Sequence, residues 1–150
     1  MTGTKEKVAD APPDAGSLQL DRFIPYRLSV LTNTVSMVIA GAYEREFGLS
    51  IPQWRVMAVL ARYPDLSAVE VAEGTAMDKV AVDRPTQGLL DNKRVLRAFD
   101  KGDRRRSILR LSAAGQPVYT RVAPMALRYE AELLSALSPN DQRTLDRLLA

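Results

Sequence analysis

The apolar positions of this 150-residue chain recur at helical spacing over most of its length, interrupted by one stretch of strand-like alternation. Between residues 18 and 47 this spacing predicts an amphipathic helix that ends before Gly48. Pro25 must lie in the first turn of that helix or kink it. Ser50 then caps a helix that reaches about Tyr63 and is apolar nearly all round, which predicts that it is buried.

Two short helices joined by a glycine-containing turn come next. Ser67 begins the first and forms the Ser-x-x-Glu capping box with Glu70. A turn over residues 74–77 leads to Asp78, which caps a second helix over residues 79–93. Such a pair is typical of a helix-turn-helix motif, although two helices that serve only to pack the core would have the same pattern.

The strand-like alternation follows at once, over residues 93–110 (KRVLRAFDKGDRRRSILR), and predicts a β-hairpin with its turn at residues 100–103. We expect Gly102 to supply the positive φ of that turn. The stretch holds eight basic and two acidic residues, a local charge of +6, whereas the whole chain carries only +3. A concentrated basic ribbon after a helix pair indicates a winged helix-turn-helix that binds nucleic acid. A solvated surface hairpin is the alternative.

Two more helices complete the pattern: Ser112 caps a long one over residues 113–136, and Ser138 begins the last. The apolar stripes of these helices and of the first exceed what one copy can bury, which predicts a twofold homodimer. The side chains expected between the two copies are Phe23, Ile24, Leu133, Leu134, Leu137, Leu145, Leu148 and Leu149.

The predicted fold is therefore mainly α with a small β-hairpin wing, a winged helix-turn-helix with N- and C-terminal dimerisation helices. Residues 1–17 have almost no large apolar side chains and are expected to form a disordered tail. The remainder, residues 18–150, is expected to be a single domain. Its dimerisation helices would span residues 18–47 and 113–150, with the DNA-binding lobe at residues 50–112.

Composition excludes much chemistry, because the chain has neither cysteine nor histidine. Disulfides, thiolate metal sites and Cys–His or Ser–His catalysis are thereby excluded, and we expect no cofactor, no metal and no enzymatic activity. The best acidic pairs for catalysis, Glu44 with Glu46 and Glu70 with Glu73, are better explained as solvated helix faces. No apolar run approaches the ~18 residues of a membrane span, and the start lacks a signal-peptide core, so we expect a cytoplasmic protein without a membrane partner.

From about Phe23 onward the chain resembles the MarR family of winged-helix transcription regulators. The most specific element is Asp103-Arg104-Arg105 followed by residues 108–115, ILRLSAAG. It is similar to the family's wing signature, an Asp-x-Arg tip, an alternating strand, then Leu-Thr/Ser and a glycine that opens the next helix. Supporting elements are residues 47–56 (FGLSIPQWRV), 71–73 (VAE) and 77–84 (MDKVAVDR).

The resemblance implies a homodimeric, sequence-specific DNA-binding regulator of a pseudo-palindromic operator, usually a repressor, often released by a small aromatic effector. The second short helix would enter the major groove and the hairpin tip the minor groove. We expect Arg105 to reach the minor groove with Asp103 orienting its guanidinium, while Arg104 and Arg106 meet phosphates. The candidate DNA-binding residues are Ser67, Lys79, Val80, Ala81, Asp83, Arg84, Gln87, Lys101, Asp103, Arg104, Arg105 and Arg106.

Any effector pocket is expected where the first, second and fifth helices meet. The candidate lining residues are Tyr43, Phe47, Trp54, Met57, Tyr119 and Val122. Core packing is the alternative explanation for these aromatic and methionine side chains.

The second short helix departs from the family pattern. Pro85 and Gly88 lie where ordinary helix formers are usual, at a cost of about 3 and up to about 1 kcal/mol. Pro85 is expected to kink the helix near Ala81 or delay its start to about Asp83. Replacing Pro85 with alanine, and Gly88 with alanine or arginine, should therefore raise thermal stability and tighten specific DNA binding. Arg94 takes the place of a frequent glycine. The alternative function is therefore a non-DNA-binding interaction module with a degenerate recognition helix.

Overall fold

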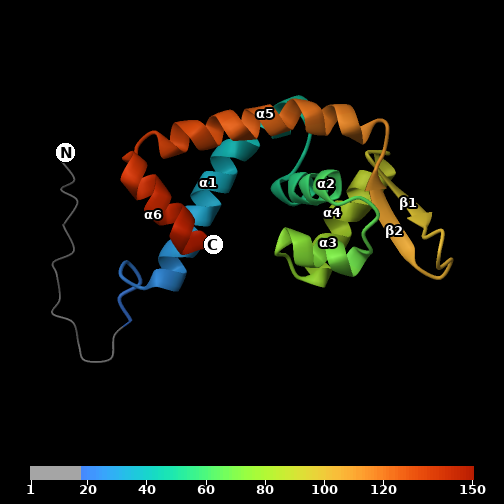
Figure 1. Cartoon of the computed structure of the whole chain (residues 1–150), viewed down its shortest axis with the longest axis horizontal. Helices are drawn as coiled ribbons and strands as arrows, with labels where there is room; N and C mark the ends of the chain where they lie inside the picture. Colours follow the sequence, from blue (N-terminus) through green and yellow to red (C-terminus); the bar gives the residue numbers. More distant parts are fainter. Residues whose placement is uncertain (1–17) are drawn as a thin grey trace, which may run out of the picture. The chain divides into compact units, whose positions relative to one another are not determined.

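The computed structural model describes residues 18–150, and these form six helices and one two-stranded antiparallel hairpin (Figure 1). The tail expected over residues 1–17 lies outside the described residues. The elements are α1 (Ile24–Phe47), α2 (Ile51–Arg62), α3 (Ala68–Thr75), α4 (Lys79–Asp91), β1 (Val95–Phe99), β2 (Ser107–Leu111), α5 (Gly115–Leu134) and α6 (Pro139–Leu149). The predicted winged helix-turn-helix is confirmed. None of the described helices is long and apolar enough to cross a membrane.

The chain divides within α1 into two compact units, one that ends at Val35 and one over Ser36–Ala150. In the first unit α1 begins at Ile24, so Pro25 lies in its first turn, where its missing amide breaks no helical hydrogen bond. The apolar side chains of this half of α1 are exposed in the single chain, with Ile24 at 57% and Leu31 at 57%.

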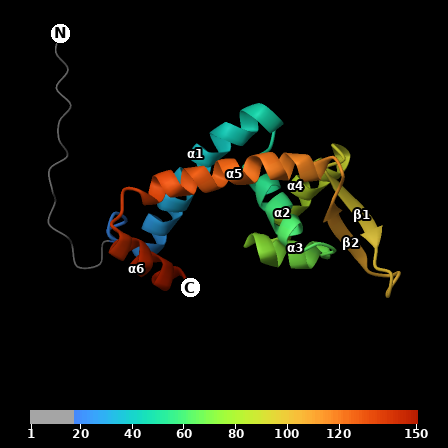
Figure 2. The same ribbon diagram turned by 45° about the horizontal axis from the view of Figure 1, so that its top comes forward.

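The core of the second unit lies among α2, α3 and α4, which Figures 1 and 2 show gathered beside the hairpin. The side chains that form it are apolar and almost fully buried. They include Val56, Met57, Leu60, Val71, Val82, Leu89, Val95, Leu109 and Val122. Burial of this set is what orients the three short helices and the hairpin relative to one another.

The predicted helix starts at α2, α3 and α4 are confirmed by their capping contacts. The Ser50 hydroxyl accepts from the Gln53 amide, and the Gln53 side chain accepts from the Ser50 amide at 3.0 Å. Ser67 and Glu70 form the same reciprocal pair, with 2.7 Å from the Ser67 amide to Glu70 Oε2. Asp78 Oδ1 accepts from the Ala81 amide at 2.8 Å. Each cap satisfies amides that the first helical turn leaves unpaired.

The recognition-helix candidate α4 runs from Lys79 to Asp91 with Pro85 inside it. The delayed start near Asp83 that the proline favours is therefore wrong. Asp78 caps the first turn and its carbonyl also accepts from the Val82 amide at 3.1 Å, so the helix is already formed before the proline. Burial of Val82, Thr86 and Leu89 offsets the local cost of Pro85.

Gly88 marks a close approach between α2 and α4. A Cβ built at Gly88 would lie 2.8 Å from Gln53 Nε2, which is closer than real Cβ contacts. The amide that would be displaced belongs to the α2 capping box, since Gln53 Oε1 accepts from Ser50. Glycine at position 88 thus leaves room for the end of the Gln53 side chain, which would have to shift for alanine and further for arginine. Alanine and arginine at this position are no longer expected to stabilise the protein outright.

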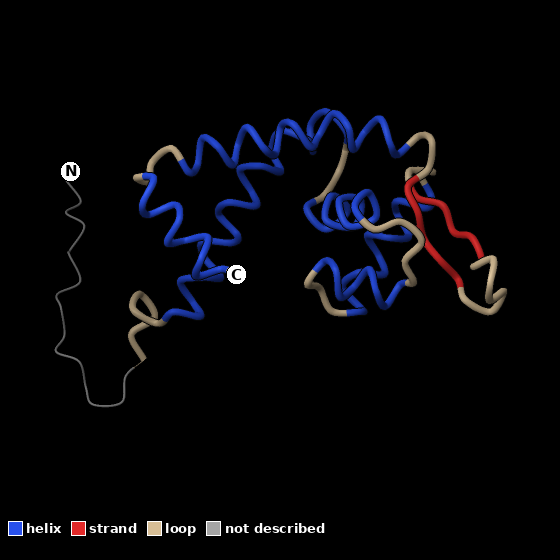
Figure 3. Tube along the Cα trace, viewed as in Figure 1, coloured by secondary structure: helices blue, strands red, loops and turns tan. Residues whose placement is uncertain are grey.

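The hairpin pairs β1 with β2 in the register Val95↔Leu111 to Phe99↔Ser107 (Figure 3). Its loop differs from the prediction, because the φ of Gly102 is not positive. Among the described glycines it is Gly48, after α1, that has a positive φ, at 61°. The Asp100 carboxylate shapes the turn instead, accepting from the Gly102 amide at 2.7 Å. A side-chain hydrogen bond therefore does the work that the sequence assigned to a left-handed glycine.

Two further boundaries differ from the prediction. The residue with left-handed backbone after α4 is Lys93, with φ 60°. The position where a glycine would be favoured is therefore Lys93, and not Arg94 as expected from the sequence. The helix expected from residue 113 to 136 begins at Gly115 and ends at Leu134. The cap predicted at Ser112 is wrong, because the N-cap residue is Ala114 and no side chain caps this helix. The Ser112 hydroxyl instead accepts from the Gly115 amide at 2.9 Å in the turn before the helix.

Gly88→Ala is expected to change the free energy of unfolding little, although alanine favours a helix over glycine by about 1 kcal/mol, because the new Cβ displaces the Gln53 amide. In a Gln53→Ala background the same change should stabilise by about 0.5–1 kcal/mol. Gly41→Ala in α1, where a Cβ meets nothing within 4 Å, is the control and should stabilise in either background. Chemical denaturation measures all of these proteins, and an equal effect of Gly88→Ala in both backgrounds would contradict the close approach.

Candidate nucleic-acid interface

The outward face of α4 carries four exposed side chains at the spacing i, i+3, i+4 and i+7, which places them on one side of the helix. They are Val80, Asp83, Arg84 and Gln87, and Val80 is 81% exposed. Lys79 and Ala81 are exposed as well. The structure therefore brings all six of the α4 residues predicted to meet DNA to the surface, whereas the opposite face packs in the core.

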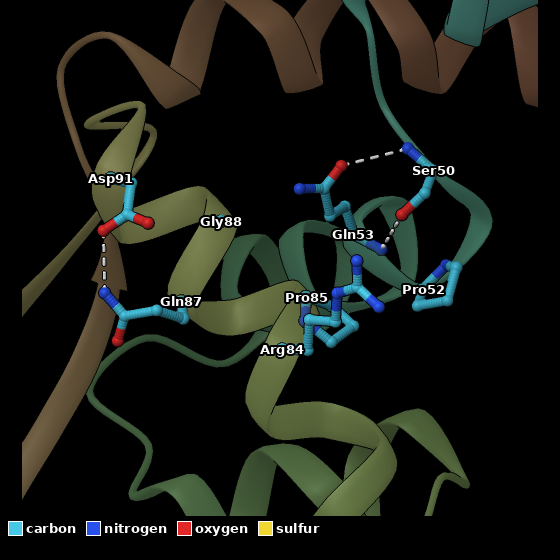
Figure 4. Close-up of a pocket in the computed structure, with 8 residues that line it drawn as sticks. All are labelled: Ser50, Pro52, Gln53, Arg84, Pro85, Gln87, Gly88 and Asp91. Atoms are coloured by element: carbon cyan, nitrogen blue, oxygen red, sulfur yellow. Dashed lines mark hydrogen bonds between the residues drawn. The ribbon is translucent and has the colours of Figure 1, made fainter.

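A groove lies on each side of this face. The first separates α4 from the start of α2 and is lined by Ser50, Pro52, Gln53, Arg84, Pro85, Gln87, Gly88 and Asp91 (Figure 4). The second separates α4 from the start of α3 and from the hairpin, and its lining is Ala68, Asp83, Arg84, Thr86, Gln87, Arg97 and Leu109. Arg84 and Gln87 border both grooves. In Figure 4 Arg84 reaches toward the start of α2 and Gln87 turns away from it toward Asp91.

A ridge between two grooves is the shape required of a helix that enters the major groove of DNA with a phosphate strand on each side. The second groove also adds two residues that are absent from the sequence-based prediction. Arg97 on β1 is exposed, and Thr86 is buried with an Oγ1 that has no hydrogen-bond partner among residues 18–150. Strand alternation could have found Arg97, because it shares a face with Val95, but nothing in the sequence distinguishes Thr86.

The wing is attached to the start of α3 by an ion pair. Arg106 Nη2 contacts Glu70 Oε1 at 2.8 Å and Oε2 at 2.7 Å, and Arg106 Nη1 lies 3.7 Å from Asp100. Because Glu70 also caps Ser67, one carboxylate joins the helix start to the hairpin. The guanidinium of Arg106 thus pairs with a carboxylate of the protein itself, although its side chain stays 42% exposed. Its contact with a phosphate stays a prediction.

The tip of the wing also differs in detail from the prediction. Asp103 Oδ1 accepts from the backbone amide of Arg105 at 2.9 Å, so its carboxylate shapes the loop and does not hold the Arg105 guanidinium. Lys101, Arg104 and Arg105 are exposed and form no ion pair within the described part of the chain. These three cations are available at the tip of the wing for an anionic partner, and their contact with DNA stays a prediction.

Hydrogen bonding lowers the pKa of Glu70 to about 2, first through the side chain and backbone amide of Ser67 and then through Arg106. The pKa of Asp100 is also lowered, by the backbone amides of Gly102 and Asp103. Both carboxylates are therefore charged throughout the physiological range and hold the wing in place there.

The six residues proposed for an effector pocket come together as a packed cluster. The ring centroids of Trp54 lie 5.9 Å from Tyr43 and 5.7 Å from Tyr119. Tyr43, Met57 and Val122 are buried to within 2% of full burial, and Phe47, Trp54 and Tyr119 pack against them. None of the six lines the groove at the end of α1, which is formed by Met37, Ala40, Gly41, Glu44, Ser50, Ile51 and Pro52. Their contacts are those of a core.

The side chains proposed for a dimer interface are exposed in the single chain, except Leu134, which is half-buried. In the first unit these are Phe23 and Ile24. In the second unit the most exposed are Leu148 at 69% and Leu149 at 76%. Large apolar side chains at such exposure are unusual for a surface that stays in water.

Comparison with profiles of known protein families found no match for this chain. The transcriptional regulator HosA of Escherichia coli is 27% identical over 101 residues, which cover 67% of this chain and 75% of HosA. A MarR/EmrR family transcriptional regulator from Acinetobacter sp. ADP1 shares the fold with a TM-score of 0.80 at 26% identity, over 88% of this chain and 93% of that chain. BpsR of Bordetella bronchiseptica, whose DNA binding is regulated by 6-hydroxynicotinic acid, has a TM-score of 0.77 at 20% identity, over 89% and 95% of the two chains.

The attachment of the wing should weaken in acid. Because the pKa of Glu70 falls from 4.5 to about 2 on folding, its stabilising contribution is complete above about pH 5 and is lost as the pH falls toward 2. We expect the Glu70 carboxyl resonance to titrate near pH 2 in an NMR experiment. Ser67→Ala and Arg106→Gln should each raise this pKa, because the Ser67 side chain is its largest single cause and Arg106 contributes through a hydrogen bond and its charge. Arg104→Gln is the control, and titration of wild-type Glu70 near pH 4.5 would refute the assignment.

Proposed function

We propose that this winged helix-turn-helix protein is a transcription regulator of the MarR family, which binds double-stranded DNA with the outward face of α4 in the major groove and the wing beside it. The observation that carries this proposal is the ridge of α4 between two grooves, next to a hairpin whose Lys101, Arg104 and Arg105 are exposed. The basic stretch that contains the wing has a charge of +6 in a chain of +3, so the attraction for phosphate is concentrated at this edge.

We further propose that the working form is a homodimer on a pseudo-palindromic operator. The exposed leucines of α6 and the apolar half of α1 support this, because an obligate interface of more than about 2,000 Å² would cover surfaces of this kind. A twofold dimer presents two copies of α4, so each half of the operator would repeat the same sequence in inverted order.

Control by a small aromatic effector in the cytoplasm, with repression as the resting state, completes the proposal. BpsR, which shares the fold, responds to 6-hydroxynicotinic acid. In this chain the half-buried rings of Trp54 and Tyr119, with centroids 5.7 Å apart, are the aromatic surface that such a ring would contact. The Arg121 guanidinium lies 4.9 Å from the neighbouring Phe47 ring centroid and would have to leave its ion pair with Glu46 to bind an acid group. The non-DNA-binding alternative loses its main support, because α4 continues through Pro85.

Arg105→Ala is expected to weaken binding to the specific site by about 1–3 kcal/mol. Arg104→Ala should weaken binding to all DNA sequences alike, and should lower the slope of log affinity against log salt concentration by about one unit or less. A binding titration against the DNA upstream of the protein's own gene, at several salt concentrations, measures both. Arg128→Ala, which removes an exposed arginine from α5, is the matched control. Unchanged binding by Arg105→Ala would exclude the wing from the interface.

The dimer is tested by sedimentation at micromolar concentration, where we expect a single species of twice the chain mass. Removal of α6 by truncation at Ser138 should shift this species toward monomer, because Leu145, Leu148 and Leu149 are lost. Leu127→Ala is the control, since Leu127 is also exposed, at 63%, but is not among the proposed contacts. A folded monomer in the wild type, or an intact dimer after truncation, would contradict this arrangement.

A further inference from the structure

We propose that Asp83 determines part of the DNA sequence preference, by accepting a hydrogen bond from the N4 amine of one cytosine in each half-site. This inference rests on the DNA-binding function proposed above and names the base that one side chain would read. Asp83 is exposed on the outward face of α4, one turn after Lys79 and Val80 and one turn before Gln87. A carboxylate in the middle of a DNA-facing stripe demands an explanation, because DNA is itself an anion.

The neighbouring acids are all occupied by structural hydrogen bonds. Asp78 caps α4, Asp91 accepts from Gln87 Nε2 at 2.7 Å, and Asp100 and Asp103 accept from backbone amides of the wing loop. Among the five carboxylates of residues 78–107, Asp83 is the one for which the described part of the chain supplies no hydrogen bond and no ion pair. Its oxygens are therefore free to accept from a ligand.

The negative charge of Asp83 itself excludes a phosphate as that ligand, whereas the cations near it allow DNA to approach. Arg84 and Arg97 line the same groove as Asp83, yet neither comes within ion-pair distance of it. These cations lower the repulsion between the carboxylate and the sugar-phosphate strands, and they are the groups that phosphates would contact. What remains for Asp83 is a hydrogen-bond donor on a base edge.

Only two bases offer a donor in the major groove, through the N4 amine of cytosine and the N6 amine of adenine. Adenine presents its N7 acceptor beside that amine, so the second carboxylate oxygen would face a lone pair. Cytosine has no acceptor on this edge, and aspartate is a typical partner of its N4 amine. Cytosine is therefore the base that matches Asp83.

The experiment begins with the sites that wild-type protein selects from random DNA, and then compares single-base variants of the best site. Replacing one cytosine of each half-site should weaken wild-type binding by about fivefold per position, the lower end of a side-chain–base contact. Asp83→Ala should lose this discrimination. Asp83→Asn should move the preference at the same position to adenine, since an amide can pair with both N6 and N7.

Glu73→Gln is the matched control, because it removes a negative charge from an exposed position of α3. If Asp83→Ala and Glu73→Gln merely tighten binding to every sequence alike, Asp83 acts only as a charge and the inference is wrong. The inference would also be overturned if the wild type preferred adenine at this position and neither Asp83→Ala nor Asp83→Asn changed that preference. Wild-type protein that binds no DNA above background would instead defeat the proposed function, and with it this inference. Circular dichroism confirms folding, which Asp83 should not affect because it makes no internal bond.

Discussion

The burial of one face of α4 is the constraint on which the rest of this molecule depends. Val82, Thr86 and Leu89 enter a core that α2 and α3 also share, and this burial sets both the position and the rotation of the helix. Because the helix period is fixed, burying that face leaves Val80, Asp83, Arg84 and Gln87 on the outside. The two grooves beside them follow from the same packing.

Acidic and basic side chains have different roles on the side of the protein proposed to face DNA. Glu70, Asp100 and Asp103 bond to groups of the protein itself, where they cap α3, shape the wing loop and hold Arg106. The cations at the wing tip are left without internal partners among the described residues. A hairpin held by its carboxylates can therefore present positive charge in a fixed geometry, which limits the ordering entropy that binding would cost.

Gly88 and Pro85 show how a helix can look poor by its propensities and still form. Pro85 cannot donate a hydrogen bond, and Gly88 has the lowest preference for helix after proline. The cap at Asp78 forms the first turn before either residue, and the close approach of Gln53 gives the missing Cβ of Gly88 a structural role. Local preferences are outweighed here by contacts between helices distant in sequence.

The sequence by itself determined the order and kind of the elements, the caps at Ser50, Ser67 and Asp78, and the basic wing, because each depends on neighbours within a few residues. Tertiary structure alone decided that α4 passes through Pro85 and that Arg106 pairs with Glu70, 36 positions away in the chain. It also brought Arg97 and Thr86 to the groove beside α4. The spacing of residues along a chain shows the period of a helix or strand. It does not show how far apart two side chains distant in sequence lie, because the packing of the folded core sets that distance.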